Sequence, residues 1–423
     1  MMPHRVPLRL PWLLGFFLVF NPYLLPASEL APRATDALGA ALGLWLVWLF
    51  CSKGLPVRLF TALVVILLIG VVPLVWGLYA YNAASDLPTT VLSLRWLLAI
   101  PYAFALFLVA LDPRQRTSVA WGLWWGCVAN IVVLALQFYG LEQLTKDVGL
   151  AAQDTLESEY GEEYRAPGMH GHANGSTAIV SLLVPVSLYL YYVGKTRSWT
   201  VVVSLGLVSL ATQLTYTRAA LLVSLTVLLM VLVAHFRRSR SARLATLVVL
   251  VVLLTSLYVG LPGGTERWED FNRIRENASV RLQTNAAALQ ISMEHPLGVG
   301  AESGVEMMRD KAANEATHDA YLQIAVMYGL ALAGLLFLLI IILALQALNP
   351  TSTAWRLEPI LALQVFGLFF WEEHLSNPSF MIMVNWLVVA SAYLIAASLR
   401  RGAPHARRPP WQGVRETNNL SHL

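Results

Sequence analysis

A series of long apolar segments limits what this chain can fold into. An α-helix rises about 1.5 Å per residue, so roughly 20 apolar residues cross the ~30 Å hydrocarbon core of a bilayer. Only 13% of the residues are charged, against about 25% in a soluble domain. The sequence predicts an all-α integral membrane protein of about twelve transmembrane helices. The segments are residues 10–27, 36–52, 57–80, 88–111, 117–139, 174–194, 198–214, 218–236, 243–261, 321–348, 354–372 and 379–399.

The distribution of charge predicts the orientation of these spans. If both termini are cytoplasmic, most of the 29 Lys and Arg residues lie on the cytoplasmic side, and among the acids only Asp112, Glu358 and Glu416 do so. That bias obeys the positive-inside rule at every cytoplasmic loop. We therefore expect one polytopic domain over residues 1–423, with loops at 140–173 and 262–320 on the outer side of the membrane and a cytoplasmic tail at 401–423.

The second large loop contains a predicted amphipathic helix from Asn277 to Glu294. Leu282, Ala286, Leu289 and Met293 share one face of it at helical spacing. Outside the membrane segments no basic patch alternates with aromatic residues, so nucleic acid is not an expected partner. The sequence also lacks a Walker-type loop and a dinucleotide fingerprint, so no energised transporter is indicated.

His318 is the first candidate for chemistry. It lies in a polar stretch directly before the apolar run 321–348, which we expect to form one membrane helix. The N-terminal end of a helix carries partial positive charge, which disfavours an imidazolium. A neutral histidine can accept a proton from a hydroxyl, so His318 is a candidate general base.

Three arginines on the same side complete the predicted site. Arg165 follows an acidic run, Arg218 lies in a very short turn between two apolar segments, and Arg281 lies on the amphipathic helix. Arginine at a membrane boundary is costly to dehydrate unless it meets an anion, and its planar fork suits phosphate oxygens. Guanidinium groups can bind a diphosphate leaving group, and a base can activate an acceptor hydroxyl. Together they suit a transfer reaction in which the hydroxyl displaces the diphosphate.

Each candidate also has a structural interpretation. Arg218 can reach lipid headgroups, Arg281 can pair with Glu276, Arg165 can pair with the acids before it, and His318 can be a helix-end histidine without a role. Two rival clusters exist. His170 and His172 resemble a metal pair, but no second His/Cys cluster completes a site, so we expect no metal. Glu372, Glu373 and His374 form an acid/base group that also suits a polar helix end.

Four motifs occur in order along the chain. They are Arg165-x-x-Gly168 with Asn174, Thr217-Arg218-Ala219, Arg281 before Pro296-Leu-Gly298-Val-Gly300, and His318-Asp-x-Tyr321-Leu-Gln leading to Tyr328-Gly329. Together they resemble the bacterial O-antigen ligase family, part of a ligase/polymerase superfamily of polytopic glycosyltransferases. The resemblance covers Arg165 to Gly329 by motif and the whole chain by its layout. One departure is Asp319, where the family often has Asn.

The resemblance implies a GT-C-like enzyme of the bacterial inner membrane with its active site on the periplasmic face. It would transfer a glycan from undecaprenyl diphosphate to a lipid A–core sugar hydroxyl, without metal or nucleotide cofactor. If the roles known in that family are carried over to the matching residues, His318 resembles the general base. Arg218 and Arg281 then resemble the diphosphate ligands, and Arg165 assists them. Asn174 and Tyr321 are possible substrate-binding residues.

The acceptor remains open within this superfamily. An O-antigen polymerase would use the same donor with another glycan as acceptor, and a protein O-oligosaccharyltransferase would use a Ser or Thr hydroxyl. The second kind usually has extra C-terminal mass, so the short tail here favours the ligase. A lipid-linked glycan flippase would line its spans with charge, whereas Arg95 is the main mid-span charge here. The sequence does not indicate an oligomeric state.

Overall fold

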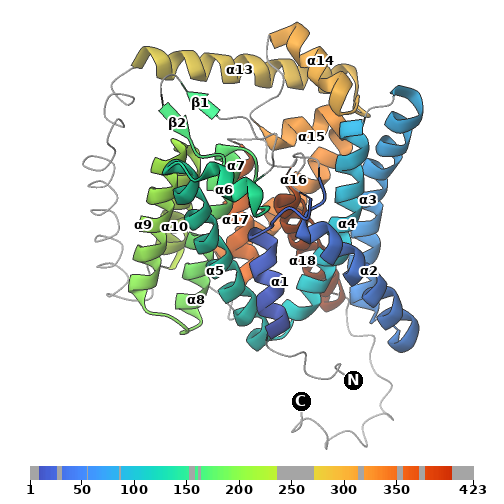
Figure 1. The fold of residues 1–423 in the computed structure, drawn as a ribbon. Coiled ribbons are helices and arrows are strands. Elements are labelled where there is room, and N and C mark those ends of the chain that lie inside the picture. Colours follow the sequence, from blue (N-terminus) through green and yellow to red (C-terminus); the bar gives the residue numbers. More distant parts are fainter. Residues whose placement is uncertain are drawn as a thin grey trace, which may run out of the picture.

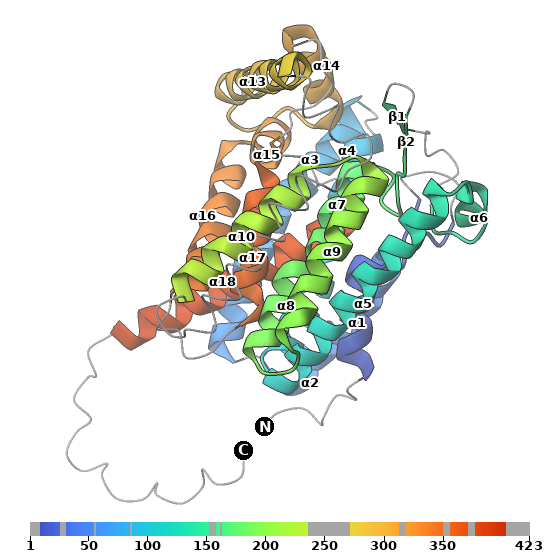
Figure 2. The same ribbon diagram turned by 90° about the vertical axis from the view of Figure 1, so that its left-hand side faces the viewer.

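The fold is a bundle of long helices with shorter elements at one end (Figure 1). The computed structural model describes residues 9–25, 31–54, 56–84, 87–151, 158–160, 163–235, 271–312, 319–349, 356–370 and 377–402. Figures 1 and 2 show α13 lying across one end of the bundle, while α1 begins and α18 ends at the other. The elements are α1 (Arg9–Val19), α2 (Ala34–Lys53), α3 (Val57–Ala84), α4 (Leu87–Ala110), α5 (Pro113–Phe138), α6 (Glu142–Asp147), β1 (Ser158–Tyr160), β2 (Glu163–Arg165), α7 (Ala173–Ser181), α8 (Leu183–Tyr192), α9 (Ser198–Thr215), α10 (Ala219–His235), α13 (Phe271–Glu294), α14 (Ala301–Ala312), α15 (Ala320–Tyr328), α16 (Leu330–Ala347), α17 (Leu357–Phe369) and α18 (Pro378–Gly402).

The predicted fold class is confirmed: the chain is an all-α, multi-pass membrane protein. Among the described residues, eight helical stretches are long and apolar enough to span a membrane, and α1, α10 and α17 are shorter apolar helices. These account for eleven of the twelve expected segments, and the remaining one, 243–261, lies outside the described residues. The described strands, β1 and β2, form a small antiparallel hairpin within the loop 140–173.

Three of the expected segments differ from the structure. The segment 174–194 is two helices, α7 and α8, which meet at Leu182. The segment 10–27 is helical only as far as Val19, because Asn21-Pro22 follows and the chain there pairs with other loops instead. The segment 321–348 is two helices, α15 and α16, which are separated at Gly329. Gly329 has φ 98° and ψ 157°, a conformation that ends a helix and that is essentially restricted to glycine.

Close helix contacts at small residues hold the short α1 against α5. A Cβ added to Gly15 would overlap the carbonyl of Val119, and one added to Gly122 would overlap the carbonyl of Trp12. Small residues allow backbones in a membrane bundle to approach closely, which increases van der Waals contact. The α1–α5 pair therefore provides a fixed support for the loops that follow these helices at the end where α13 lies.

Candidate active site

Arg165 is fixed to the turn between α9 and α10. Its Nε donates a hydrogen bond to the carbonyl of Thr215 at 2.8 Å, and its Nη2 donates to Asn174 Oδ1 at 2.9 Å and to Thr217 Oγ1 at 3.1 Å. Thr217 Oγ1 itself donates to Asn174 Oδ1 at 2.8 Å. Two of the predicted site residues, Arg165 and Asn174, are thus in direct contact, and both touch the turn that carries Arg218.

The turn itself has an unusual backbone. Tyr216 has φ 52°, and it is the only described residue other than glycine with a positive φ. Such a left-handed conformation is costly for a side chain with a Cβ and is often found at functional sites. It reverses the chain between α9 and α10 within three residues. Arg218, which is half-buried, directly precedes α10 and comes from the same turn that binds Arg165.

Buried hydrogen bonds fix the segment 166–172 that follows Arg165. The side chain of Gln137 accepts a hydrogen bond from the Gly168 amide at 2.7 Å, and Ser176 Oγ donates to the carbonyl of Pro167 at 2.7 Å. At its end, His172 Nδ1 accepts a hydrogen bond from the amide of Asn174 at 3.3 Å and caps α7. This contact gives His172 a structural role, because it fixes the start of the helix that carries Asn174.

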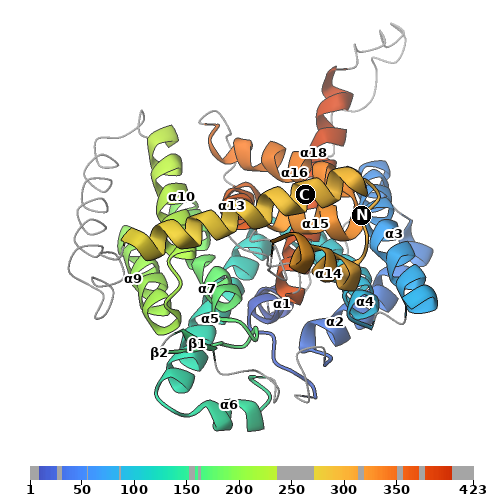
Figure 3. The same ribbon diagram turned by 90° about the horizontal axis from the view of Figure 1, so that it is seen from above.

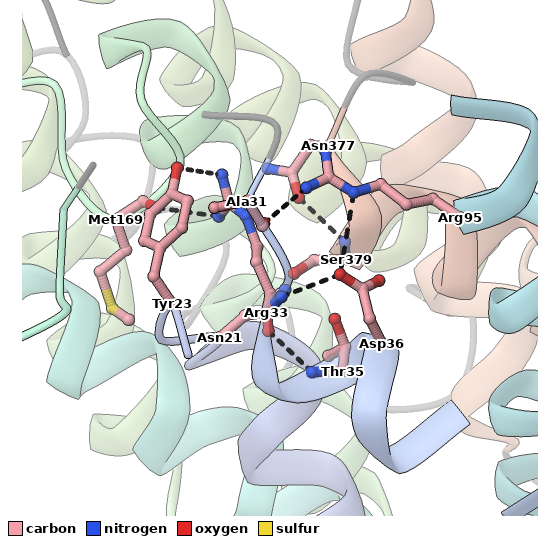
Figure 4. A network of polar contacts seen from close by, with 10 residues as sticks. All are labelled: Asn21, Tyr23, Ala31, Arg33, Thr35, Asp36, Arg95, Met169, Asn377 and Ser379. Carbon is pink, nitrogen blue, oxygen red and sulfur yellow. Dashed lines mark hydrogen bonds and ion pairs between the residues drawn. The ribbon is translucent and has the colours of Figure 1, made fainter. Parts of the chain in front are cut away.

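A buried arginine from the first loop supports the same segment. Arg33, the residue before α2, is 3% exposed, and its Nη1 donates to the carbonyl of Met169 at 2.9 Å. Its Nη2 donates to the Tyr23 hydroxyl, and the guanidinium lies over the Tyr23 ring at 4.1 Å from the centroid. Figure 4 shows Arg33 between Tyr23 and Met169. The loop beside Arg165 is therefore tied to the N-terminal helices.

Asp36 connects Arg33 to a second buried arginine. Its Oδ2 accepts a hydrogen bond from the Arg33 amide at 2.9 Å and lies 3.7 Å from Arg95 Nε on α4. Arg95 also donates to the carbonyl of Ala31 at 2.8 Å, and Figure 4 places its guanidinium beside Asn377 near the start of α18. A buried charge needs such partners, so the mid-span Arg95 is part of a structural network.

Arg281 comes from a different element. It lies on α13, where helical spacing places it on the same side as the buried Ala288 and Ser292. The predicted helix 277–294 is confirmed as the C-terminal part of α13. Lys311 of α14 forms an ion pair with Glu294 at 2.7 Å and joins the end of α13 to α14, and this ammonium lowers the pKa of the Glu294 carboxyl.

His318 and the cluster 372–374 lie outside the described residues. The next residue, Asp319, is the N-cap of α15, and its Oδ1 accepts hydrogen bonds from the amides of Tyr321 at 2.8 Å and Leu322 at 3.0 Å. Asn caps a helix as well as Asp does, which gives a physical reason why this chain can have Asp319 where the resembling family often has Asn. Burial of the Asp319 carboxyl raises its pKa.

Tyr321 lies in an aromatic cluster. Its ring is 7% exposed and contacts the rings of Phe337, Phe366, Phe369 and Phe370 at centroid distances of 5.1 to 6.2 Å. Within the part of the chain that the structure describes, no group hydrogen-bonds to its buried hydroxyl. The ring therefore joins α15 to α16 and α17, and its predicted contact with substrate stays a prediction.

The glycine motifs form a backbone crossing. The segment Pro296–Gly300 runs against the end of α15, where the Val299 amide donates to the carbonyl of Val326 at 2.8 Å and the Gly300 amide to that of Met327 at 3.1 Å. A Cβ on Gly298 would lie 2.6 Å from the carbonyl oxygen of Met327, and one on Gly329 would lie 2.8 Å from that of Pro296. Both glycines are needed because two backbones cross there.

The fold defines the class of polytopic helical membrane proteins. Residues 203–339 match the family described as O-antigen ligase, so this part of the chain is similar to the O-antigen ligase/polymerase superfamily. Arg218, Arg281, His318 and Tyr321 all lie within the matched residues. No match was found among curated proteins.

Some supporting residues were missed by sequence reasoning. Thr217 is one in part, because the motif Thr217-Arg218-Ala219 included it without assigning it a role. Arg33 and Asp36 are others, and their partners Met169 and Arg95 are distant in sequence, so no local pattern pointed to them. Thr217 and Arg33 fix the turn before α10 and the segment that follows Arg165.

Proposed function

We propose that the protein is a glycosyltransferase that ligates O-antigen from undecaprenyl diphosphate onto lipid A–core at the periplasmic face of the inner membrane. The observation that carries this proposal is the joining of Arg165 to the turn of Arg218 by Asn174 and Thr217, in a chain whose residues 203–339 match the O-antigen ligase family. Two arginines, one on this turn and one hydrogen-bonded to it, suit the two phosphates of a lipid-linked donor.

In the proposed reaction, the acceptor hydroxyl oxygen attacks the anomeric carbon of the donor glycan. The new glycosidic bond forms as the bond from that carbon to the diphosphate oxygen breaks. His318 takes the hydroxyl proton, and the charge that develops on the departing undecaprenyl diphosphate is stabilised by Arg218 and Arg281, with Arg165 assisting. A single in-line attack inverts the configuration at the anomeric carbon.

Reconstitution tests the proposal directly. The purified protein in liposomes would receive undecaprenyl diphosphate-linked glycan together with lipid A–core, and the coupled product would be scored. Ligation requires formation of that product with release of the lipid diphosphate. Chain growth on the donor alone would indicate a polymerase, modification of an added protein an O-oligosaccharyltransferase, and movement of the donor between leaflets without coupling a flippase.

Two substitutions test the assigned roles. His318→Ala should abolish ligation while leaving the protein in the membrane, because no base remains to accept the hydroxyl proton. Arg281→Lys should be severe, because an ammonium cannot replace a bidentate fork. Arg114→Lys, an exposed arginine at the other end of the bundle, is the matched control and should retain activity. Near-normal ligation by the first two variants would remove the corresponding assignments.

A further inference from the structure

Helix α13 has apolar side chains on two opposite faces. One face is buried, with Ala288 and Ile291 in a cluster together with Met308 of α14 and Val326 of α15. Helical spacing places Leu282, Leu289 and Met293 on the other side, and these are 72%, 47% and 69% exposed. A helix in water normally keeps polar residues on its free face, so this second face needs an apolar environment.

The C-terminal end of α13 lies at the level where a membrane span ends. Trp76 Nε1 donates a hydrogen bond to the carbonyl of Leu297 at 2.9 Å, just after α13. Trp76 lies in the last part of the expected span 57–80, and tryptophan is enriched at the membrane–water interface. Leu297 is itself 77% exposed. The hydrogen bond therefore holds the C-terminal end of α13 at the level of Trp76 on α3.

The exposed apolar surface continues from α3 to α13. Val75 and Tyr79 beside Trp76 are 58% and 62% exposed on the outside of the bundle, where a membrane span faces lipid. Figure 3, seen along the bundle, shows α13 running across the ends of the long helices toward α3. Met293 and Leu289 lie in the last two turns of α13, before Leu297. Exposed apolar residues of α3 and of α13 therefore lie on either side of the Trp76–Leu297 hydrogen bond.

From these observations we infer that α13 is an interfacial helix whose stripe of Leu282, Ala286, Leu289 and Met293 lies in the headgroup–acyl boundary of the adjacent leaflet. An amphipathic helix in this position buries its apolar face a few ångströms into the lipid. Arg281 lies away from that stripe, and the helix fixes its depth relative to the lipid phosphates. This last consequence rests on the proposed function, whereas the docking of α13 does not.

Depth-dependent quenching tests the inference in the intact protein. The background variant is Cys51→Ser, since Cys51 is exposed and Cys127 is buried. A fluorophore is attached through Met293→Cys or, as a matched control, through Gln283→Cys, an exposed polar position on the flank of the same helix. The protein is reconstituted into phosphatidylethanolamine–phosphatidylglycerol vesicles that contain a nitroxide-labelled lipid, and aqueous iodide is the second quencher.

We expect the lipid nitroxide to quench the label at 293 several-fold more than the label at 283, and iodide to do the reverse. Equal access of iodide to both labels would overturn the inference. Protection of the label at 293 from both quenchers would also overturn it, because a protein surface would then cover the stripe. The measurement reads position rather than catalysis, so failure of the proposed ligase activity leaves its result unchanged.

Discussion

The backbone crossing at Gly329 gives a sharp test of how the loop after α13 is joined to the membrane helices. In Gly329→Ala the backbone must keep φ 98° and ψ 157°, which costs a residue with a Cβ about 1–3 kcal/mol. The new Cβ would also lie 2.8 Å from the carbonyl oxygen of Pro296 and 2.9 Å from the carbonyl carbon of Leu297. Overpacking against backbone atoms adds about 1–3 kcal/mol.

The expected net loss for Gly329→Ala is about 1–5 kcal/mol, after subtracting roughly 0.4–1 kcal/mol for the lower entropy of the unfolded chain. That is a large part of a typical total stability of about 5–15 kcal/mol. Thermal unfolding of the purified protein in detergent, followed by tryptophan fluorescence, would measure the decrease. Ligation should fall as well, since the crossing orients both α13 and α15.

Gly334→Ala is the matched control for this prediction. Gly334 lies within α16, where an added Cβ meets no atom within 4 Å. Alanine is favoured over glycine inside a helix by about 0.5–1 kcal/mol, so this variant should be as stable as the parent or slightly more so. If Gly329→Ala and Gly334→Ala unfolded at the same temperature, the crossing would not constrain the fold as argued.

Four further predictions concern the site and its supports. Asp319→Ala should lower the stability by about 1 kcal/mol through loss of the N-cap of α15, whereas Asp319→Asn should keep the cap. Because burial raises the pKa of this carboxyl, its ionisation opposes folding, so the wild type should lose stability relative to Asp319→Asn as the pH rises above 3.8, and thermal unfolding against pH would reveal this. Arg33→Lys should cost about 1–3 kcal/mol because it leaves a buried carbonyl or hydroxyl unsatisfied, and denaturation in detergent would measure the loss. Thr217→Val should raise the KM for the lipid-linked donor more than it lowers kcat, because it removes the hydroxyl between Asn174 and Arg165, and an unchanged KM would argue against that positioning role. Ligation should continue in EDTA, whereas a loss reversed by added metal would return His170 and His172 to consideration as ligands.

The apolar pattern predicted much of the membrane fold, because a bilayer leaves few alternatives to a long apolar helix. Where the prediction failed, local backbone chemistry decided the outcome. The run 321–348 is apolar throughout, so hydropathy has no means of locating the break at Gly329. The break requires knowing that Pro296–Gly300 crosses there, which is a tertiary contact.

In the candidate site, too, the sequence indicated some features and left others to tertiary contacts. Arg165 and Arg218 could be singled out as candidates from residue type and position in the chain, because arginine beside a membrane span is unusual. Their connection through Asn174 and Thr217 was not, since these partners lie 9 and 52 residues from Arg165. The lipid-facing stripe on α13 was visible as one face of a helix, but its exposure depends on which side contacts α14 and α15.

The pairing of Arg95 with Asp36 bears on how the protein is made. Both residues lie within the first 110 residues of the chain, on α2 and α4. A nascent chain can therefore neutralise this guanidinium inside the bilayer before the second half has been translated. The contacts that α18 makes with the same region come last, so membrane insertion of the N-terminal helices does not have to wait for them.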